Sequence, residues 1–197
     1  MQTLGYATAT EAADDPALVL VGRTYQEHIT GGPNSHVYWF QARNHLDGPL
    51  LGPVRIMRNY VLISVLKHSP SLALKRWILR CLGMRLGQGV TIASGVMLDF
   101  FFPELIEIGE NTIIGMDAML LTHEFLHDRF RVGRVRIGAN CLVGAKSTVL
   151  AGVTIADGTV ISAMSLVHRG TPDGAFVGGV PIRFLRRQCA RVRRARP

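Results

Sequence analysis

The residues best suited to chemistry lie between Leu120 and Ile137, in a segment that begins LLTHEFLHDRFRVGRV. This segment holds two histidines, His123 and His127, and two acidic residues, Glu124 and Asp128. Histidine is the usual general base near neutral pH, because the ordinary pKa of its ring is about 6.5. Such a base takes the proton from an attacking hydroxyl or amine. We expect that role for His123, and the alternative is that it only shapes a loop.

The segment interrupts a repeat of six residues. An aliphatic residue returns every six positions from Leu86 to Leu98, and after a slip of four residues the repeat resumes at Ile108. After the break, the phase holds over six consecutive repeats from Ile137. A period of six fits neither the 3.6 residues of a helical turn nor simple alternation. It predicts a short strand and then a corner, with the aliphatic residue and the small residue two before it pointing into a narrow prism. A glycine often follows the aliphatic residue, and we expect it to turn the corner. The twelve aliphatic positions are Leu86, Ile92, Leu98, Ile108, Ile114, Leu120, Ile137, Val143, Val149, Ile155, Ile161 and Val167.

Ordinary short strands with glycine turns are the alternative, but hairpins would not keep one phase over six repeats. We therefore predict an all-β core, a parallel β-helix over residues 85–182. Residues 1–84 are expected to form a partly helical segment, and residues 183–197 a basic tail. We expect the break, residues 123–134, to protrude as a functional loop, because a solenoid gains nothing from an excursion there.

Two helices are predicted before the repeat, over residues 55–68 and 70–82. For the second, Ser69 is a natural N-cap, Pro70 fits the first helical position and Gly83 fits the C-terminal stop. Its apolar stripe should contain Leu74 and Ile78, along with Cys81 and Leu82. A basic helix of this kind lies on a membrane or covers the open end of the β-helix, and we favour the cover.

Composition excludes several classes of protein. The chain has 197 residues, of which 48% are apolar, so it is not disordered throughout. No apolar run approaches the roughly 18–20 residues of a membrane span. The cysteines, Cys81, Cys141 and Cys189, are far apart and form no CxxC pair, which favours a reducing compartment. The start of the chain lacks a secretory pattern, so we expect a cytoplasmic protein.

Charge is concentrated in two basic islands. Residues 51–85 carry seven basic and no acidic side chains, and residues 173–197 carry seven basic and one acidic. Such islands attract phosphate groups of nucleic acids, membranes or phosphorylated cofactors. They lack the run of aromatic residues that stacks bases, so we expect no nucleic-acid partner.

The segments VRIGANCLVGAKSTVLAGVTIADGTVISAMSLV and GGVPIRFLRR resemble the hexapeptide-repeat acyltransferases, nearest the galactoside, maltose and nodulation-factor O-acetyltransferases. The resemblance covers roughly residues 82–187. It implies a left-handed parallel β-helix and a homotrimer. It also implies an acyltransferase that moves an acyl group directly from acetyl-CoA or another acyl-CoA to a hydroxyl of a small-molecule or sugar-like acceptor.

The resemblance further implies roles for single residues. His123, after Thr122, matches the general base of the family, and the backbone N–H of Ala145 matches the group that polarises the thioester. Polar contacts to the acceptor are expected from Asp99, Ser94, Glu124 and His127, although Ser94 replaces a usual Asn. Contacts to CoA are expected from Ala145, Ala163, Ser165, His168, Arg169, Arg183 and Arg186.

Several alternatives stay open at this point. The acceptor could be an amine, the donor could be an acidic acyl carrier protein that suits the basic islands, or the chain could be a silent hexapeptide scaffold. Carbonic anhydrases of the γ type share the β-helix and bind zinc through three histidines. No histidine lies between His68 and His123 to supply the upstream ligand, so we expect no metal. We also expect no membrane contact.

Overall fold

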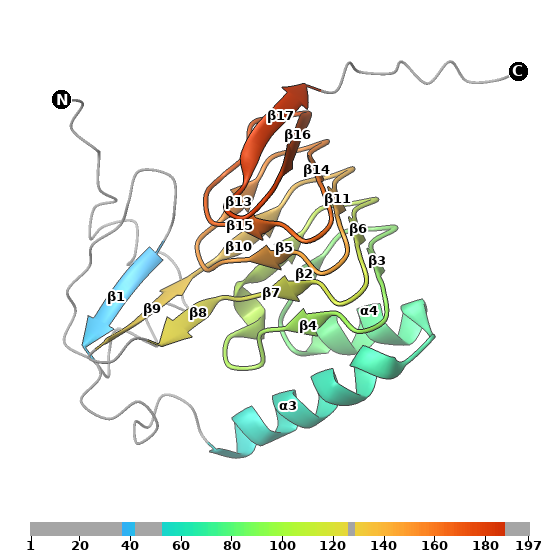
Figure 1. Cartoon of the computed structure of the whole chain (residues 1–197). Coiled ribbons are helices and arrows are strands. Elements are labelled where there is room, and N and C mark those ends of the chain that lie inside the picture. Colours follow the sequence, from blue (N-terminus) through green and yellow to red (C-terminus); the bar gives the residue numbers. More distant parts are fainter. Residues whose placement is uncertain (1–36, 42–52, 126–128, 188–197) are drawn as a thin grey trace, which may run out of the picture.

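Most strands of the protein wind into a three-sided parallel β-helix (Figure 1). The computed structural model describes residues 37–41, 53–125 and 129–187. The first face contains β2 (Arg85–Leu86), β5 (Ile106–Ile108), β10 (Val135–Ile137) and β13 (Thr154–Ile155). The second contains β3 (Thr91–Ile92), β6 (Ile113–Ile114), β11 (Leu142–Val143), β14 (Val160–Ile161), β16 (Ala175–Gly178) and β17 (Arg183–Arg187). The third contains β4 (Met97–Leu98), β7 (Met119–Leu120), β12 (Thr148–Val149) and β15 (Leu166–Val167).

The repeat determines which side chains fill the prism. All twelve aliphatic positions of the repeat are buried, and so are the smaller residues two positions before them. Equivalent aliphatic residues stack from coil to coil in parallel register, as Ile114 does between Ile92 and Val143. The predicted inward-facing positions are therefore confirmed.

The expected role of the glycines is wrong. A glycine that follows an aliphatic residue does not turn the corner, because the positive φ angles fall two residues later, for example at Asn111 after Gly109 and at Lys146 after Gly144. Such a glycine is instead required by close stacking of the coils. A Cβ on Gly144 would lie 2.4 Å from the backbone nitrogen of Ala163 on the next coil, well inside contact distance.

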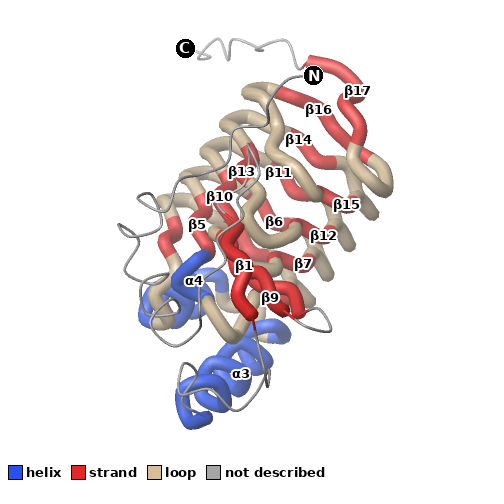
Figure 2. The backbone as a smooth tube through the Cα atoms, turned by 90° about the vertical axis from the view of Figure 1, so that its left-hand side faces the viewer, coloured by secondary structure: helices blue, strands red, loops and turns tan. Residues whose placement is uncertain are grey.

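Two helices, α3 (Pro53–His68) and α4 (Leu72–Cys81), lie at the first coil (Figure 2). The start of α4 differs from the prediction, because Ser71 caps it by accepting a hydrogen bond from the Leu74 N–H. Its buried side also differs. Leu82 is buried and Ile78 is partly buried, as predicted. Leu74 and Cys81 are exposed, however, and Lys75 and Leu79 are buried in their place.

Hydrogen bonds to the first coil explain why basic residues of α4 turn inward. The Lys75 ammonium donates to the carbonyls of Ile92 and Ala93, and Arg80 donates to the carbonyl of Leu86. Among the described residues, no coil precedes the first coil, so these carbonyl groups have no neighbouring strand to donate hydrogen bonds to them. Burial lowers the pKa of Lys75, a cost that its carbonyl partners offset.

The break in the repeat is a β-hairpin rather than an irregular loop. Strand β8 (His123–Phe125) pairs antiparallel with β9 (Arg129–Gly133), and β1 (Val37–Gln41) adds a third strand to this small sheet, which extends from the side of the β-helix (Figure 1). The expected tail also differs, because residues 183–187 form β17, which pairs antiparallel with β16. No helix in the described part of the chain is both long and apolar enough to cross a bilayer.

Candidate active site

The candidate base lies where the chain leaves the third face. Strands β4 and β7 are paired with Leu98 opposite Leu120. Asp99 follows Leu98 directly, and His123 comes three residues after Leu120, so the two meet on adjacent coils. The Nδ1 atom of His123 lies 2.5 Å from Oδ2 of Asp99.

The carboxylate of Asp99 is an anchor for the turn around it. Oδ2 also accepts hydrogen bonds from the backbone N–H groups of Thr122 and His123, and Oδ1 accepts from those of Phe101 and Phe102. Burial by itself would raise the pKa of Asp99, but the hydrogen bond and charge of His123 and the Thr122 donors outweigh it, so the pKa lies below its usual value. Asp99 is therefore a buried anion.

The charge of Asp99 determines which ring nitrogen of His123 carries the proton. An ionised carboxylate only accepts hydrogen bonds, so Nδ1 must be the donor in this pair. In the neutral ring, Nε2 then carries the lone pair that can accept a proton. The side chain of His123 is 13% exposed. Its ring is therefore fixed by Asp99 but still reaches the protein surface, unlike a core residue.

Aromatic rings form one wall beside the candidate base. The ring of Phe101 lies 4.6 Å from that of His123, centroid to centroid, and Phe100 lies 4.6 Å from Phe101. Tyr60 of α3 meets Phe100 edge-on at 5.4 Å. A wall of this kind presents an apolar surface and ring edges to whatever approaches His123.

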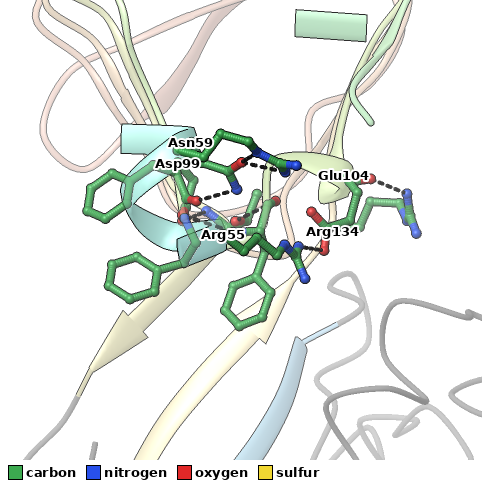
Figure 3. A network of polar contacts seen from close by, with 10 residues as sticks. Arg55, Asn59, Asp99, Glu104 and Arg134 are labelled. Atoms are coloured by element: carbon green, nitrogen blue, oxygen red, sulfur yellow. Dashed lines mark hydrogen bonds and ion pairs between the residues drawn. The ribbon is translucent and has the colours of Figure 1, made fainter. Parts of the chain in front are cut away.

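Helix α3 is joined to this region by polar contacts (Figure 3). The buried side chain of Asn59 donates to the carbonyl of Phe100, and Arg58 donates to Asn59 Oδ1. Near the start of α3, Arg55 forms an ion pair with Glu104, whose backbone carbonyl accepts a hydrogen bond from Arg134. These contacts fix the turn of residues 99–104 against α3.

The structure does not support two of the expected roles. Asp99 was expected to contact the acceptor, but its carboxylate is completely buried and both oxygens already accept hydrogen bonds. Ser165 was expected to contact CoA, but it is buried, and its Oγ atom bonds Ser162 and the Gly179 N–H. Both side chains hold the backbone instead.

The other expected contacts divide between two corners of the β-helix. The corner between the second and third faces, here called the entry corner, holds residues 93–95, 115–117, 144–146 and 162–164. Backbone hydrogen bonds stack it, from Asp117 to Ser94 and from Met164 to Ala145. Ser94, Ala145 and Ala163 therefore share the entry corner. Asp99, His123, His168 and Arg169 lie beyond the other end of the third face.

Within one chain, the third face separates Ala145 from His123. The Ala145 N–H donates to no atom of the described residues. Arg183 and Arg186 are exposed on β17 at the end of the second face, and the guanidinium of Arg186 lies 5.3 Å above the ring of Phe176. Glu124 follows His123 on β8 and is half-buried, whereas His127 lies outside the described residues.

Sequence reasoning missed the aromatic wall and its support from α3. The available signal was the run Phe100–Phe102 directly after Asp99, where the repeat slips by four residues. In the described part of the chain, no three His, Cys, Asp or Glu side chains come together as a metal site.

The model of the family "Bacterial transferase hexapeptide (six repeats)" matches residues 134–169. YvoF of Bacillus subtilis (strain 168), named as an acetyltransferase, is 39% identical over 164 residues, which cover 83% of this chain and 91% of YvoF.

Solved structures show the same fold. The hexapeptide-repeat acetyltransferase VCA0836 of Vibrio cholerae, complexed with acetyl-CoA, matches with a TM-score of 0.59 at 21% identity and covers 68% of this chain and 87% of its own. A maltose O-acetyltransferase of Clostridium difficile 630 matches with a TM-score of 0.58 at 19% identity, covering 76% and 92%. The predicted left-handed parallel β-helix is thus confirmed.

Proposed function

Because the chain belongs to the hexapeptide-repeat transferase family, we propose that it is an acetyltransferase that moves the acetyl group of acetyl-CoA directly onto a hydroxyl of a small, sugar-like acceptor, with His123 as general base. The observation that carries the proposal is the pairing of His123 Nδ1 with the buried carboxylate of Asp99. This pairing gives one ring nitrogen a fixed proton and leaves the basic lone pair on the other.

The proposed reaction uses His123, Asp99 and the backbone of Ala145. Nε2 of His123 takes the proton of the acceptor hydroxyl while the oxygen attacks the thioester carbonyl. The resulting tetrahedral oxyanion accepts a hydrogen bond from the backbone N–H of Ala145. The carbon–sulfur bond then breaks, and the departing thiolate of CoA receives the proton from the imidazolium. The charge of Asp99 stabilises that imidazolium while the proton is held.

We place this reaction between neighbouring subunits of a homotrimer. Within one chain the third face lies between Ala145 and His123, so a thioester held at Ala145 needs the His123 of a second chain. Outward-facing apolar side chains on the second face and at the entry corner support such a contact, including Ile113, Leu142, Met116 and Met164, which are exposed in the single chain.

We expect light scattering to find a trimer at micromolar concentration and below. The physical reason is the apolar second face, which a lone chain would expose to water. A stable monomer that still transfers acetyl groups would contradict both the trimer and the shared site.

Arg183 and Arg186 are expected to bind the phosphates of CoA. A well-formed charge-assisted hydrogen bond contributes roughly 1.5–3 kcal/mol and an exposed ion pair only about 0–1. Each change to alanine should therefore weaken CoA binding about 3- to 30-fold. Calorimetric titration with CoA and dephospho-CoA measures the Kd of each ligand. The kcat at saturating donor should stay unchanged.

Arg136→Ala is the matched control, because Arg136 is a partly exposed arginine of the first face that pairs with Glu107. If Arg183 or Arg186 contacts the 3′-phosphate, the wild-type protein should bind dephospho-CoA more weakly than CoA. The alanine variants should bind the two ligands almost equally. Equal losses in wild type and variants would show that these arginines do not bind that phosphate.

The acceptor is found by a screen with acetyl-CoA, in which release of the CoA thiol is monitored for sugars, alcohols and amines. Thiol release that depends on a hydroxyl compound and yields its acetyl ester supports the proposal. Release with amines alone would overturn the assignment of O-acetylation.

A further inference from the structure

Helix α3 exposes apolar side chains along one complete side. Val54, Met57, Val61 and Val65 follow the spacing of one helix face, and their exposed fractions are 81%, 61%, 48% and 66%. The opposite side of α3 is buried through Asn59, Ile63 and Leu66. A helix that is apolar on both sides is normally enclosed by protein or membrane, but no described residue covers the exposed side of α3.

Helix α4 adds to the same surface. Leu74 and Trp77 are exposed, Trp77 by 65%, whereas Lys75 and Leu79 are buried against the first coil. Both helices turn their buried sides to the same end of the β-helix, where Ile63, Leu66 and Leu79 join one core (Figure 1). Their exposed sides therefore point away from the β-helix. We call this surface the cap face: Val54, Met57, Val61, Val65, Leu74 and Trp77.

Positive charge surrounds the cap face without acidic compensation from the same helices. Residues 53–85 contain seven basic and no acidic side chains. Arg55 and Arg85 pair with Glu104 and Glu107. Arg58 and Lys67 of α3 form no ion pair with any carboxylate of the described residues. Arg76 and Arg80 of α4 donate instead to the carbonyls of Val90 and Leu86 on the first coil.

We propose that the cap face docks on an anionic lipid bilayer. Its aliphatic, methionine and tryptophan side chains would enter the boundary between headgroups and acyl chains, and the surrounding cations would meet anionic headgroups. A second copy of the same face is a poor partner, because a symmetric contact would bring like charges together. The proposal replaces the expectation from sequence that the protein does not contact membranes.

The cap face is continuous with the candidate base. Tyr60 is half exposed on α3, and the row of rings from Tyr60 through Phe100 and Phe101 ends at His123. Docking through α3 therefore brings the neighbourhood of His123 to the membrane–water boundary. This consequence rests on the proposed function, whereas docking itself does not.

Vesicle flotation tests the proposal with the full chain. We expect the wild-type protein to float with phosphatidylcholine vesicles that contain about 30% phosphatidylglycerol, and to bind pure phosphatidylcholine about tenfold more weakly. The double variant Val61→Glu/Val65→Glu should bind the anionic vesicles at least about tenfold more weakly, because two carboxylates then face the headgroups. Tryptophan emission should shift to the blue on binding, and Trp77→Phe should abolish that shift.

Charge variants and the oligomeric state distinguish membrane docking from self-association. Arg58→Gln/Lys67→Gln keeps the apolar side chains and should lose the preference for anionic vesicles, whereas Arg136→Gln on the first face should retain it. Thermal unfolding checks that each variant is folded. The proposal would be overturned if the wild-type protein does not float with the anionic vesicles. It would also be overturned if Val61→Glu/Val65→Glu and Arg58→Gln/Lys67→Gln both float as the wild type does. A larger assembly in solution that Val61→Glu/Val65→Glu breaks would overturn it too, since a second copy would then be the partner. None of these outcomes depends on acetyl transfer.

Discussion

Replacing His123 by alanine is expected to lower kcat by about 10²- to 10⁴-fold, the usual contribution of a general base. The reason is that Nε2 meets the proton of the acceptor hydroxyl only as the thioester is attacked, so its contribution is made in the transition state. The Kd for CoA should stay near the wild-type value, because neither the phosphates nor the thioester carbonyl depend on the imidazole. Initial rates of thiol release and calorimetric titration with CoA measure the two quantities.

His68→Ala is a suitable control, since His68 is an exposed histidine at the end of α3 and is outside the proposed site. Its kcat should equal that of wild type. A His123→Ala enzyme with near-full turnover would end the assignment of His123, and His127 would be the next histidine to replace.

Asp99→Asn is the second change with a large expected effect. The amide keeps the size of the carboxylate but removes its charge and offers an N–H group, so Nδ1 of His123 is no longer held as a donor. We expect kcat to fall about 10²- to 10⁴-fold, because an amide in place of the carboxylate that orients a catalytic histidine favours the wrong tautomer. The KM for the acceptor should change little, because the carboxylate is buried.

The expected split between kcat and KM distinguishes two roles of Asp99. A raised KM for the acceptor with unchanged kcat would restore the role expected from sequence, a direct contact to the acceptor. Ser94→Ala is the comparison, since Ser94 is exposed at the entry corner and its hydroxyl lies 3.5 Å from the Lys67 carbonyl.

The lowered pKa of Asp99 also predicts a dependence of stability on pH. The folded state favours the ionised carboxylate, so this contribution is complete above the ordinary pKa of about 3.9 and is lost as pH falls through the lower pKa of the folded state. Asp99→Asn should lack this part of the acid dependence. Thermal unfolding of wild type and variant below about pH 5 measures the difference.

The repeat allowed the β-helix to be predicted from sequence because each buried position follows from a fixed period. All twelve aliphatic residues point inward, and no long-range information was needed to place them. The glycines were misread for a related reason. A period reports which residues share a corner, but the contact that requires Gly144 comes from Ala163 on the next coil.

The base was found from its residue type and its place at a break in the repeat, whereas its surroundings were not. Asp99 meets His123 because β4 and β7 pair in a particular register, and the slip after Leu98 hides that register from the sequence. The apolar stripe predicted for α4 holds only at Ile78 and Leu82, because unpaired carbonyls of the first coil accept hydrogen bonds from Lys75 and turn that residue inward. Strand β1 was not predicted, and its partner β9 is more than 85 residues away in sequence.

The most direct test of the account is a rapid-quench single turnover with acetyl-CoA labelled in its acetyl group, in the presence of an acceptor found by the screen. In wild type we expect the label to pass to the acceptor in step with thiol release, with none retained on the protein. In His123→Ala we expect acetyl-CoA to bind with unchanged affinity and the label to stay in acetyl-CoA. Label trapped on the protein, or near-wild-type transfer in His123→Ala, would contradict direct transfer with His123 as base.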